Sequence, residues 1–191
     1  MTMAIDIPGF IADFKEHATD HGFHVHDERH FVETYSLRQS WEVDVHPEAG
    51  CGGPIDLHVA LDVDPNVLLS LRSQLEEMPD FEEPPDEYFL DLYFNWAVPP
   101  LHDPPDLLVL ATDLAGLGGI DLPVEVSAVD SYSDVMGAPE RRLQLTGKSQ
   151  VSLVDVLMGR EQLCDVLDSS REVSEYLLDR VAGWMELPGG S

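Results

Sequence analysis

Two rows of alternating apolar residues constrain the fold of this chain more than any other feature. One row runs from Ile55 to Val63, and a longer one runs from Tyr88 to Val98. Successive side chains of a strand point to opposite faces of a sheet, so each row predicts a strand with a continuous apolar face. The second row also carries Phe89 and Tyr93 on its other face. We therefore expect it to be a central strand that is covered on both sides.

Aspartate and proline together mark the start of two helices. An aspartate can accept a free backbone N–H at a helix N-terminus, and proline in the first turn loses no hydrogen bond. Asp64-Pro65 therefore predicts a helix that ends at about Met78. Asp103-Pro104-Pro105-Asp106 predicts a second helix, which ends in the glycine-rich segment 116–119. Because strands are predicted on either side of them, we expect both helices to lie on the face of the sheet.

The N-terminal part of the chain predicts one helix and two further strands. Apolar residues at helical spacing between Pro8 and His21 predict a short amphipathic helix that ends before a glycine. Strands are expected at Phe31–Leu37 and Trp41–His46. Segment 47–54 holds three glycines and two prolines, so it should form the turn to the next strand.

Strand and helix patterns also follow one another in the C-terminal part. Alternation over 120–128 predicts one strand, and Leu143 and Leu145 suggest another. The pattern becomes helical from Ser152 onward. Ser169-Ser-Arg-Glu172 fits a capping box, which predicts that a last helix begins there.

These elements predict one α+β domain over residues 1–191. Strands outnumber crossover helices, which favours a largely antiparallel sheet with helices packed on it and a helical C-terminus. The acidic, proline-rich segment 79–86 is expected to be a loop, and 187–191 a frayed tail. In element order alone, this pattern resembles the small acidic chaperones that hold secretion substrates, but a likeness of topology does not carry function.

Charge is the most unusual property of the composition. The chain has 37 acidic and 10 basic residues, for a formal net charge of -27. Such a chain is repelled by nucleic-acid phosphates and by anionic membranes, so we expect neither as a direct partner. A basic protein, a divalent metal or a salt-rich cytoplasm is compatible with this charge.

The acidic residues are unevenly distributed along the sequence. The net charge is -4 over 1–39, -21 over 40–140, where Arg72 is the single base, and -2 over 141–191. Adaptation to salt, drift in a lysine-poor genome and selection for a negative surface can each produce an acidic chain. The uneven distribution favours the third explanation. Twenty-one charges match about 36 Å of duplex DNA, so the middle segment could mimic DNA toward a basic partner.

The segment around the proline-rich loop is the predicted partner-binding surface. Its acidic side chains would attract a basic protein, and Phe81 would add an apolar anchor, because charge alone raises the association rate more than the affinity. The predicted binding residues are Glu76, Glu77, Asp80, Phe81, Glu82, Glu83, Asp86 and Glu87.

Two groups of histidines offer a metal-binding alternative. Five lie near the N-terminus: His17, His21, His24, His26 and His30. In the second group, pairing of the strand at 41–46 with the strand at 55–63 would bring Asp44, His46, Asp56 and His58 to one face. Solvated side chains explain both groups as well, so the sequence predicts no tightly bound metal and no cofactor.

No catalytic motif stands out. Leu-Thr-Gly-Lys-Ser at 145–149 lacks the first glycine of a phosphate-binding loop, because position 142 is Arg142. Cys51 and Cys164 have no zinc or redox spacing and are expected to be free thiols in a cytoplasmic protein. The sequence therefore predicts a non-enzymatic acidic protein that captures a basic macromolecular partner, as immunity, inhibitor or chaperone-like proteins do. A metal-binding protein or a metal-dependent enzyme is the alternative.

Overall fold

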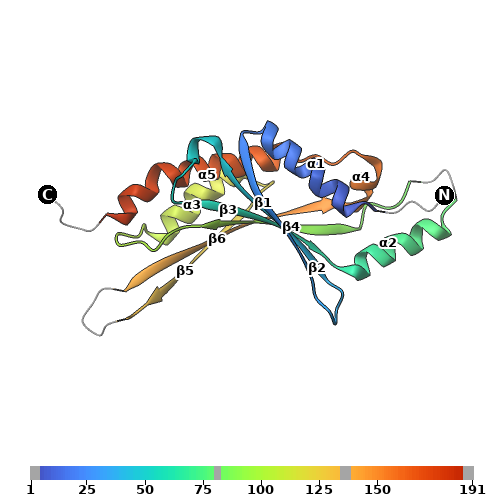
Figure 1. The fold of residues 1–191 in the computed structure, drawn as a ribbon, viewed down its shortest axis with the longest axis horizontal. Coiled ribbons are helices and arrows are strands. Elements are labelled where there is room, and N and C mark those ends of the chain that lie inside the picture. The colour runs from blue at the N-terminus through green and yellow to red at the C-terminus, as the bar shows by residue number, and fades with distance from the viewer. Residues whose placement is uncertain (1–4, 80–82, 134–138, 187–191) are drawn as a thin grey trace.

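A computed structural model describes residues 5–79, 83–133 and 139–186 and shows an α+β fold (Figure 1). Six strands form one antiparallel sheet in the order β1-β2-β3-β4-β6-β5. The strands are β1 (Phe23–Val32), β2 (Gln39–Pro47), β3 (Asp56–Val63), β4 (Phe89–Ala97), β5 (Val124–Ser131) and β6 (Glu140–Ser152). The predicted fold class is confirmed.

Five α-helices in the described part of the chain accompany this sheet, and four of them form a layer on one of its faces. They are α1 (Ile7–Asp20), α2 (Pro65–Glu77), α3 (Leu107–Gly118), α4 (Leu153–Met158) and α5 (Cys164–Met185). The helix α1 packs on β1, α5 packs on β2, and α3 lies between β5 and α5. The hairpins β1-β2 and β5-β6 extend away from this layer (Figure 1). Within the described ranges no helix is both long and apolar enough to cross a bilayer.

The core lies between this helical layer and the sheet. The apolar rows predicted for β3 and β4 supply its centre, and Leu57, Leu61 and Phe94 are at most 1% exposed. The indole Nε1 of Trp96 donates a hydrogen bond of 2.8 Å to Ser174 Oγ on α5. This bond gives the buried indole its polar partner and ties the central strand to the longest helix.

The helix starts agree closely with the sequence. Asp64 accepts a hydrogen bond from the backbone N–H of Asn66, and α2 begins at Pro65 as predicted. In α3 the capping residue is Asp106, whose side chain accepts from the backbone N–H groups of Leu108 and Val109. The helix α3 lies on the sheet as expected. The helix α2 instead extends beyond the end of the sheet (Figure 1), and Leu71 is its one fully buried residue.

Strand β4 is central, as predicted, but it is covered on one side alone. Its apolar row is buried, whereas Asp91, Tyr93 and Asn95 on the other side are partly exposed. The prediction of cover on both faces was wrong, because every helix that packs on the sheet lies on the same face. We call the other side, which is free of helices, the open face.

Two other boundaries differ from the prediction. The strand predicted at Phe31–Leu37 is the end of β1 followed by a hairpin turn, in which Leu37 has a φ of 58°. A bulge between Val25 and Asp27 shifts the register of β1 and conceals the alternation of its first half. The predicted capping box is also wrong, since α5 passes through it without a break. The Ser170 hydroxyl is buried and donates to the carbonyl of Leu167 within the helix.

Candidate functional site

The four residues predicted by strand pairing, Asp44, His46, Asp56 and His58, lie on the open face, but of these only Asp44 and His58 are in direct contact among the described residues. Asp44 and His58 are direct neighbours in the register of β2 and β3, and Asp44 Oδ1 lies 2.6 Å from His58 Nδ1. Arg29 from β1 donates to both oxygens of Asp44 at 2.6 Å each. These bonds hold the pKa of Asp44 below its ordinary value. The Asp44 carboxylate is therefore already occupied by protein groups.

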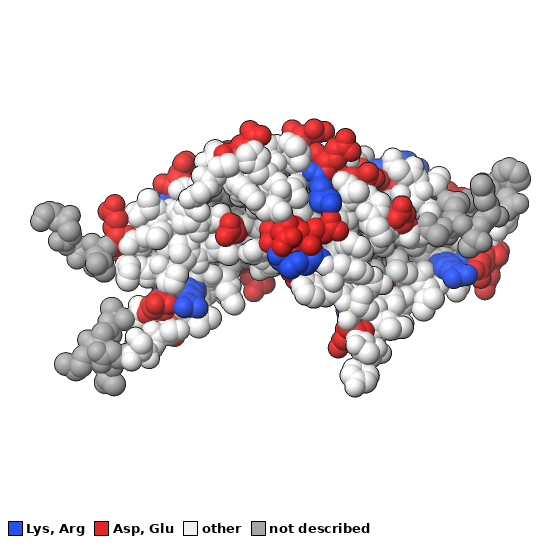
Figure 2. All heavy atoms as spheres, viewed as in Figure 1, with Lys and Arg blue, Asp and Glu red and all other residues white. Residues whose placement is uncertain are grey.

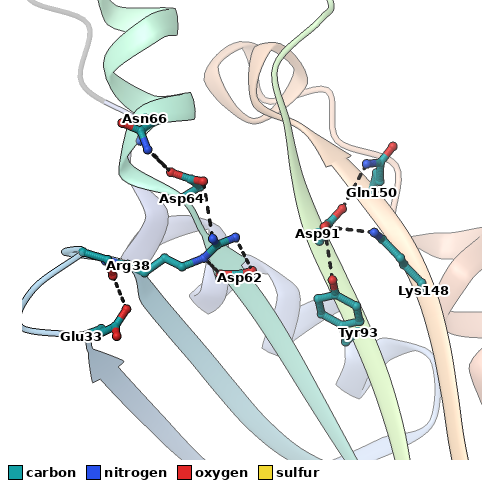
Figure 3. Close-up of polar contacts among 10 residues, drawn as sticks. Glu33, Arg38, Asp62, Asp64, Asn66, Asp91, Tyr93, Lys148 and Gln150 are labelled. Atoms are coloured by element: carbon teal, nitrogen blue, oxygen red, sulfur yellow. Dashed lines mark hydrogen bonds and ion pairs between the residues drawn. The ribbon is translucent and has the colours of Figure 1, made fainter.

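Two further polar networks stand at one end of the open face (Figure 3). Arg38 Nη2 donates to Asp62 Oδ2 at 2.9 Å and Nε donates to Oδ1 at 3.1 Å. Lys148 Nζ lies 3.1 Å from Asp91 Oδ2, whose carboxylate also accepts from Gln150 at 3.0 Å. Burial would raise the pKa of Asp91, but these hydrogen bonds lower it overall.

These networks belong to a pattern that includes every basic residue of the chain. Nine of the ten Lys and Arg side chains lie within 4.0 Å of a carboxylate oxygen. The tenth, Arg180, stacks on the ring of Tyr176 at 3.7 Å. Several of these bases come from the two ends of the sequence and neutralise acids of the middle segment. Ion pairs therefore reduce the charge difference between the segments of the sequence, and apart from Arg180 the uncompensated charge of the described surface is negative.

The predicted partner-binding segment is described in part. Asp80, Phe81 and Glu82 lie outside the described residues. The remaining five residues are Glu76, Glu77, Glu83, Asp86 and Glu87, and all are exposed.

Internal contacts already engage three of these five. Arg72 pairs with Glu76, Arg160 pairs with Glu83, and Ser152 Oγ donates to Asp86 at 2.6 Å. Glu77 and Glu87 therefore present the least compensated charge of the described part of this segment.

A second acidic surface lies on the helical layer, where the sequence analysis did not place one. In the view of Figure 2, acidic side chains gather along the top of the molecule, over α1 and α5. All seven acids of this surface are exposed, and none forms an ion pair with another described residue: Asp13, Glu16, Asp20, Asp165, Glu172, Glu175 and Asp179. We call this surface the helical acidic ridge.

Helical geometry explains how the ridge arises. Acids spaced three or four residues apart share one side of a helix, and both α1 and α5 follow that spacing. The two helices meet where His21 Nδ1 lies 2.8 Å from Asp168 Oδ1. The spacing of these acids can be read from the sequence. Segment 141–191 has a net charge near zero, however, so the sequence did not indicate an acidic surface there. Three of the six bases of that segment lie on β6, away from the ridge, and pair with acids there or on neighbouring strands.

A compact group of histidines and one cysteine occupies the corner of the open face where β1 meets β2. His24 and His46 are direct neighbours in the register, and Cys51 returns to them from the turn after β2. The Cys51 Sγ atom lies 3.1 Å from His24 Nδ1 and 3.2 Å from His46 Nε2. His26 stacks on His46 with ring centroids 4.3 Å apart. We call these four residues the His–Cys corner.

His46 is the buried member of this corner, with 7% of its surface exposed. Burial lowers its pKa below the ordinary value, and the neighbouring His26 and His24 lower it further. The sequence analysis placed these side chains in two separate candidate groups and placed Cys51 in neither. The pairing of β1 with β2 brings His24 and His26 next to His46, which the sequence alone did not show.

Comparison with known proteins adds no family to this description. No protein-family model, no curated protein and no solved structure matches the chain. The fold and its surfaces are therefore the basis for any functional conclusion.

Proposed function

We propose that the protein is a non-enzymatic binding protein that captures a basic macromolecular partner, as immunity, inhibitor or chaperone-like proteins do. One observation carries the proposal: every Lys and Arg of the chain is engaged by a carboxylate or an aromatic ring. Nine bases are paired with acids, and Arg180, which is exposed on α5, is the one base whose charge no carboxylate of the described residues neutralises. A field of one sign attracts a basic partner and raises its association rate.

The helical acidic ridge is the best-placed surface for this contact. Its acids project from two helices that are anchored on the core, so they are held in place before a partner arrives. Acids three or four residues apart follow one another by about 5 Å along a helix axis. A regular row of negative charges is what a protein that binds DNA would recognise, so a DNA-mimicking role belongs to this proposal.

Metal binding at Asp44, His46, Asp56 and His58 has less support as a function. Arg29 occupies both oxygens of Asp44, and His58 is bound to the same carboxylate. A metal would have to displace a bidentate arginine, which is among the stronger protein hydrogen-bonding pairs.

The test begins with recovery of a partner from the native host on the immobilised full chain and its identification by mass spectrometry. The purified pair is then measured between 0.05 and 0.5 M salt. We expect the association rate to fall steeply as salt rises, because the Debye length shortens below about 10 Å. Binding that is insensitive to salt would refute an electrostatic capture mechanism.

Two matched variants locate the contact. One neutralises three acids of the ridge on α1 (Asp13→Asn, Glu16→Gln, Asp20→Asn), and the other neutralises three acids of the loop (Glu83→Gln, Asp86→Asn, Glu87→Gln). Each should change the free energy of unfolding by about 0.5 kcal/mol or less, because the side chains are at the surface. If only the ridge variant associates more slowly with the partner, the ridge is the binding surface. If only the loop variant does, the loop is the binding surface.

A salt titration of folding separates this proposal from adaptation to salt. A binding protein should remain folded at about 0.1 M salt, where exposed charges more than about 10 Å apart are already screened. Unfolding that reverses only in molar salt would instead explain the acidity as halophilic. The cytoplasmic location expected from the sequence remains a prediction.

A further inference from the structure

We propose that His24, His46 and Cys51 form a binding site for one thiophilic divalent transition-metal ion, with Zn²⁺ as the probe. This site goes beyond the proposed function and does not depend on it. Among the residues that the structure describes, this is the one group in which three His, Cys, Asp or Glu donor atoms come together, all within 4.8 Å of one another.

Two of the three distances between the donor atoms are close to those of a tetrahedral zinc centre, and the third, between the two nitrogens, is at most 4.8 Å. Zinc binds imidazole nitrogen at about 2.0–2.1 Å and thiolate sulfur at about 2.3 Å, which places N and S about 3.5 Å apart. The corresponding Sγ···N distances here are 3.1 and 3.2 Å. An outward shift of Cys51 Sγ by a few tenths of an ångström would fit the ion, and Cys51 is exposed and free to make it.

Without a metal, the tautomers of His24 and His46 decide which hydrogen bonds Cys51 can form with them. A thiol has one hydrogen, yet Cys51 Sγ faces two imidazole nitrogens at similar distances. It can therefore donate to one of them, and it accepts from the other only if that nitrogen carries a hydrogen. A metal ion bound to the thiolate would engage both nitrogens at once.

The outer nitrogen of each histidine has a polar group nearby. His46 Nδ1 lies 2.6 Å from His26 Nε2, so a hydrogen on Nδ1 leaves the lone pair of Nε2 directed at Cys51. His24 Nε2 lies 3.6 Å from Glu48 Oε1. Such outer contacts set the tautomer and the ring orientation of a metal ligand.

The backbone holds the three donors together before any ion binds. His24 and His46 are paired across β1 and β2, and the backbone N–H of Glu48 donates to the carbonyl of Gly22 at 3.0 Å. Gly50 is buried against Leu178, where an added Cβ would lie 2.8 Å from a methyl group. This close approach seats the turn that carries Cys51 against α5. Three protein donors leave the fourth zinc position to water.

The test titrates Zn²⁺ into the full chain after removal of metal by chelation, under reducing conditions without a thiol. We expect one tightly bound ion per chain and, with Co²⁺, a thiolate-to-metal charge-transfer band. Cys51→Ser should abolish that band and weaken Zn²⁺ binding by about 100-fold or more, since loss of an outer partner alone typically costs about 10–100-fold. Cys164→Ser is the matched control, because its thiol is also exposed and stands apart from the corner.

A measurement on the unaltered protein guards against a variant that does not fold. Zn²⁺ should slow alkylation of Cys51 but not of Cys164, as read by mass spectrometry of the modified peptides. His24→Gln changes an exposed side chain and should remove most of this protection. Equal Zn²⁺ affinity in Cys51→Ser and Cys164→Ser, or no protection of Cys51, would overturn the proposal.

Discussion

The two faces of the sheet are built from the same strands but perform different tasks. On the helix-covered face, β3 and β4 present apolar side chains that are almost fully buried. On the open face, the intervening residues form ion pairs and the His–Cys corner. Because a strand alternates its side chains between faces, one segment can supply a core and a polar surface at once. We expect stability to depend on the first face and specific chemistry on the second.

Truncation of the core should have the largest effect. Phe94→Ala removes a fully buried ring from β4 and should lower the free energy of unfolding by about 3–5 kcal/mol. Its neighbour Asn95 points to the open face and accepts a bond of 3.0 Å from Thr146. Asn95→Ala should cost about 1 kcal/mol. Urea unfolding of both variants checks the comparison, and similar losses would contradict the assignment of stability to one face.

Removal of the link between β4 and α5 should have the next largest effect. Trp96→Phe deletes the donor to Ser174 and leaves a small space, at a cost of about 1–3 kcal/mol. A double-mutant cycle with Ser174→Ala isolates the hydrogen bond from the packing. If the losses in the free energy of unfolding of the two single variants add up in the double variant, the hydrogen bond itself contributes little to stability.

The helical layer should lose stability at alkaline pH. The Tyr176 hydroxyl on α5 donates to Asp113 on α3, and burial, followed by this bond, raises the pKa of Tyr176 to about 12. A free tyrosine titrates near 10, so between pH 10 and 12 the folded state binds more protons than the unfolded state, and stability falls as pH rises. We expect Tyr176→Phe to cost about 1 kcal/mol at pH 7 and that difference to shrink above pH 10.

Chemical unfolding of both proteins between pH 8 and 12 measures this window. Taking the difference between them cancels the general repulsion among the other charges. A difference that stays constant across the range would contradict the raised pKa.

The ion pairs of the open face should lose their contribution to stability at acid pH, and this effect should be smaller than that of Tyr176 at alkaline pH. The pKa of Asp91 is lowered in the folded state, so its contribution is present above the unfolded value near 4 and is lost as pH falls. Lys148→Met removes one partner of a partly exposed pair and should cost at most about 1 kcal/mol. Unfolding of both proteins at pH 3 and pH 6 tests this, and we expect the cost to be larger at pH 6.

Much of the fold follows from patterns that neighbours in the sequence create. The alternation at 55–63 and the aspartates that begin α2 and α3 act within a few residues, so they were predicted nearly to the residue. Failures came where a distant contact overrides a local pattern. The predicted capping box contains Ser170, but the Ser170 hydroxyl is buried and bonds inside α5, next to the turn from which Ser174 accepts the bond of Trp96. The bulge in β1 hid the alternation around His24 and His26.

The sequence by itself therefore determined the α+β class, the strand faces and the excess of negative charge. Tertiary structure alone decided which acids keep that charge, because bases from both ends of the chain reach acids of the middle segment across the sheet. It also decided that His24, His46 and Cys51 meet. Their proximity depends on the register of β1 on β2, and register is set by the burial of a whole face rather than by the residues that it brings together.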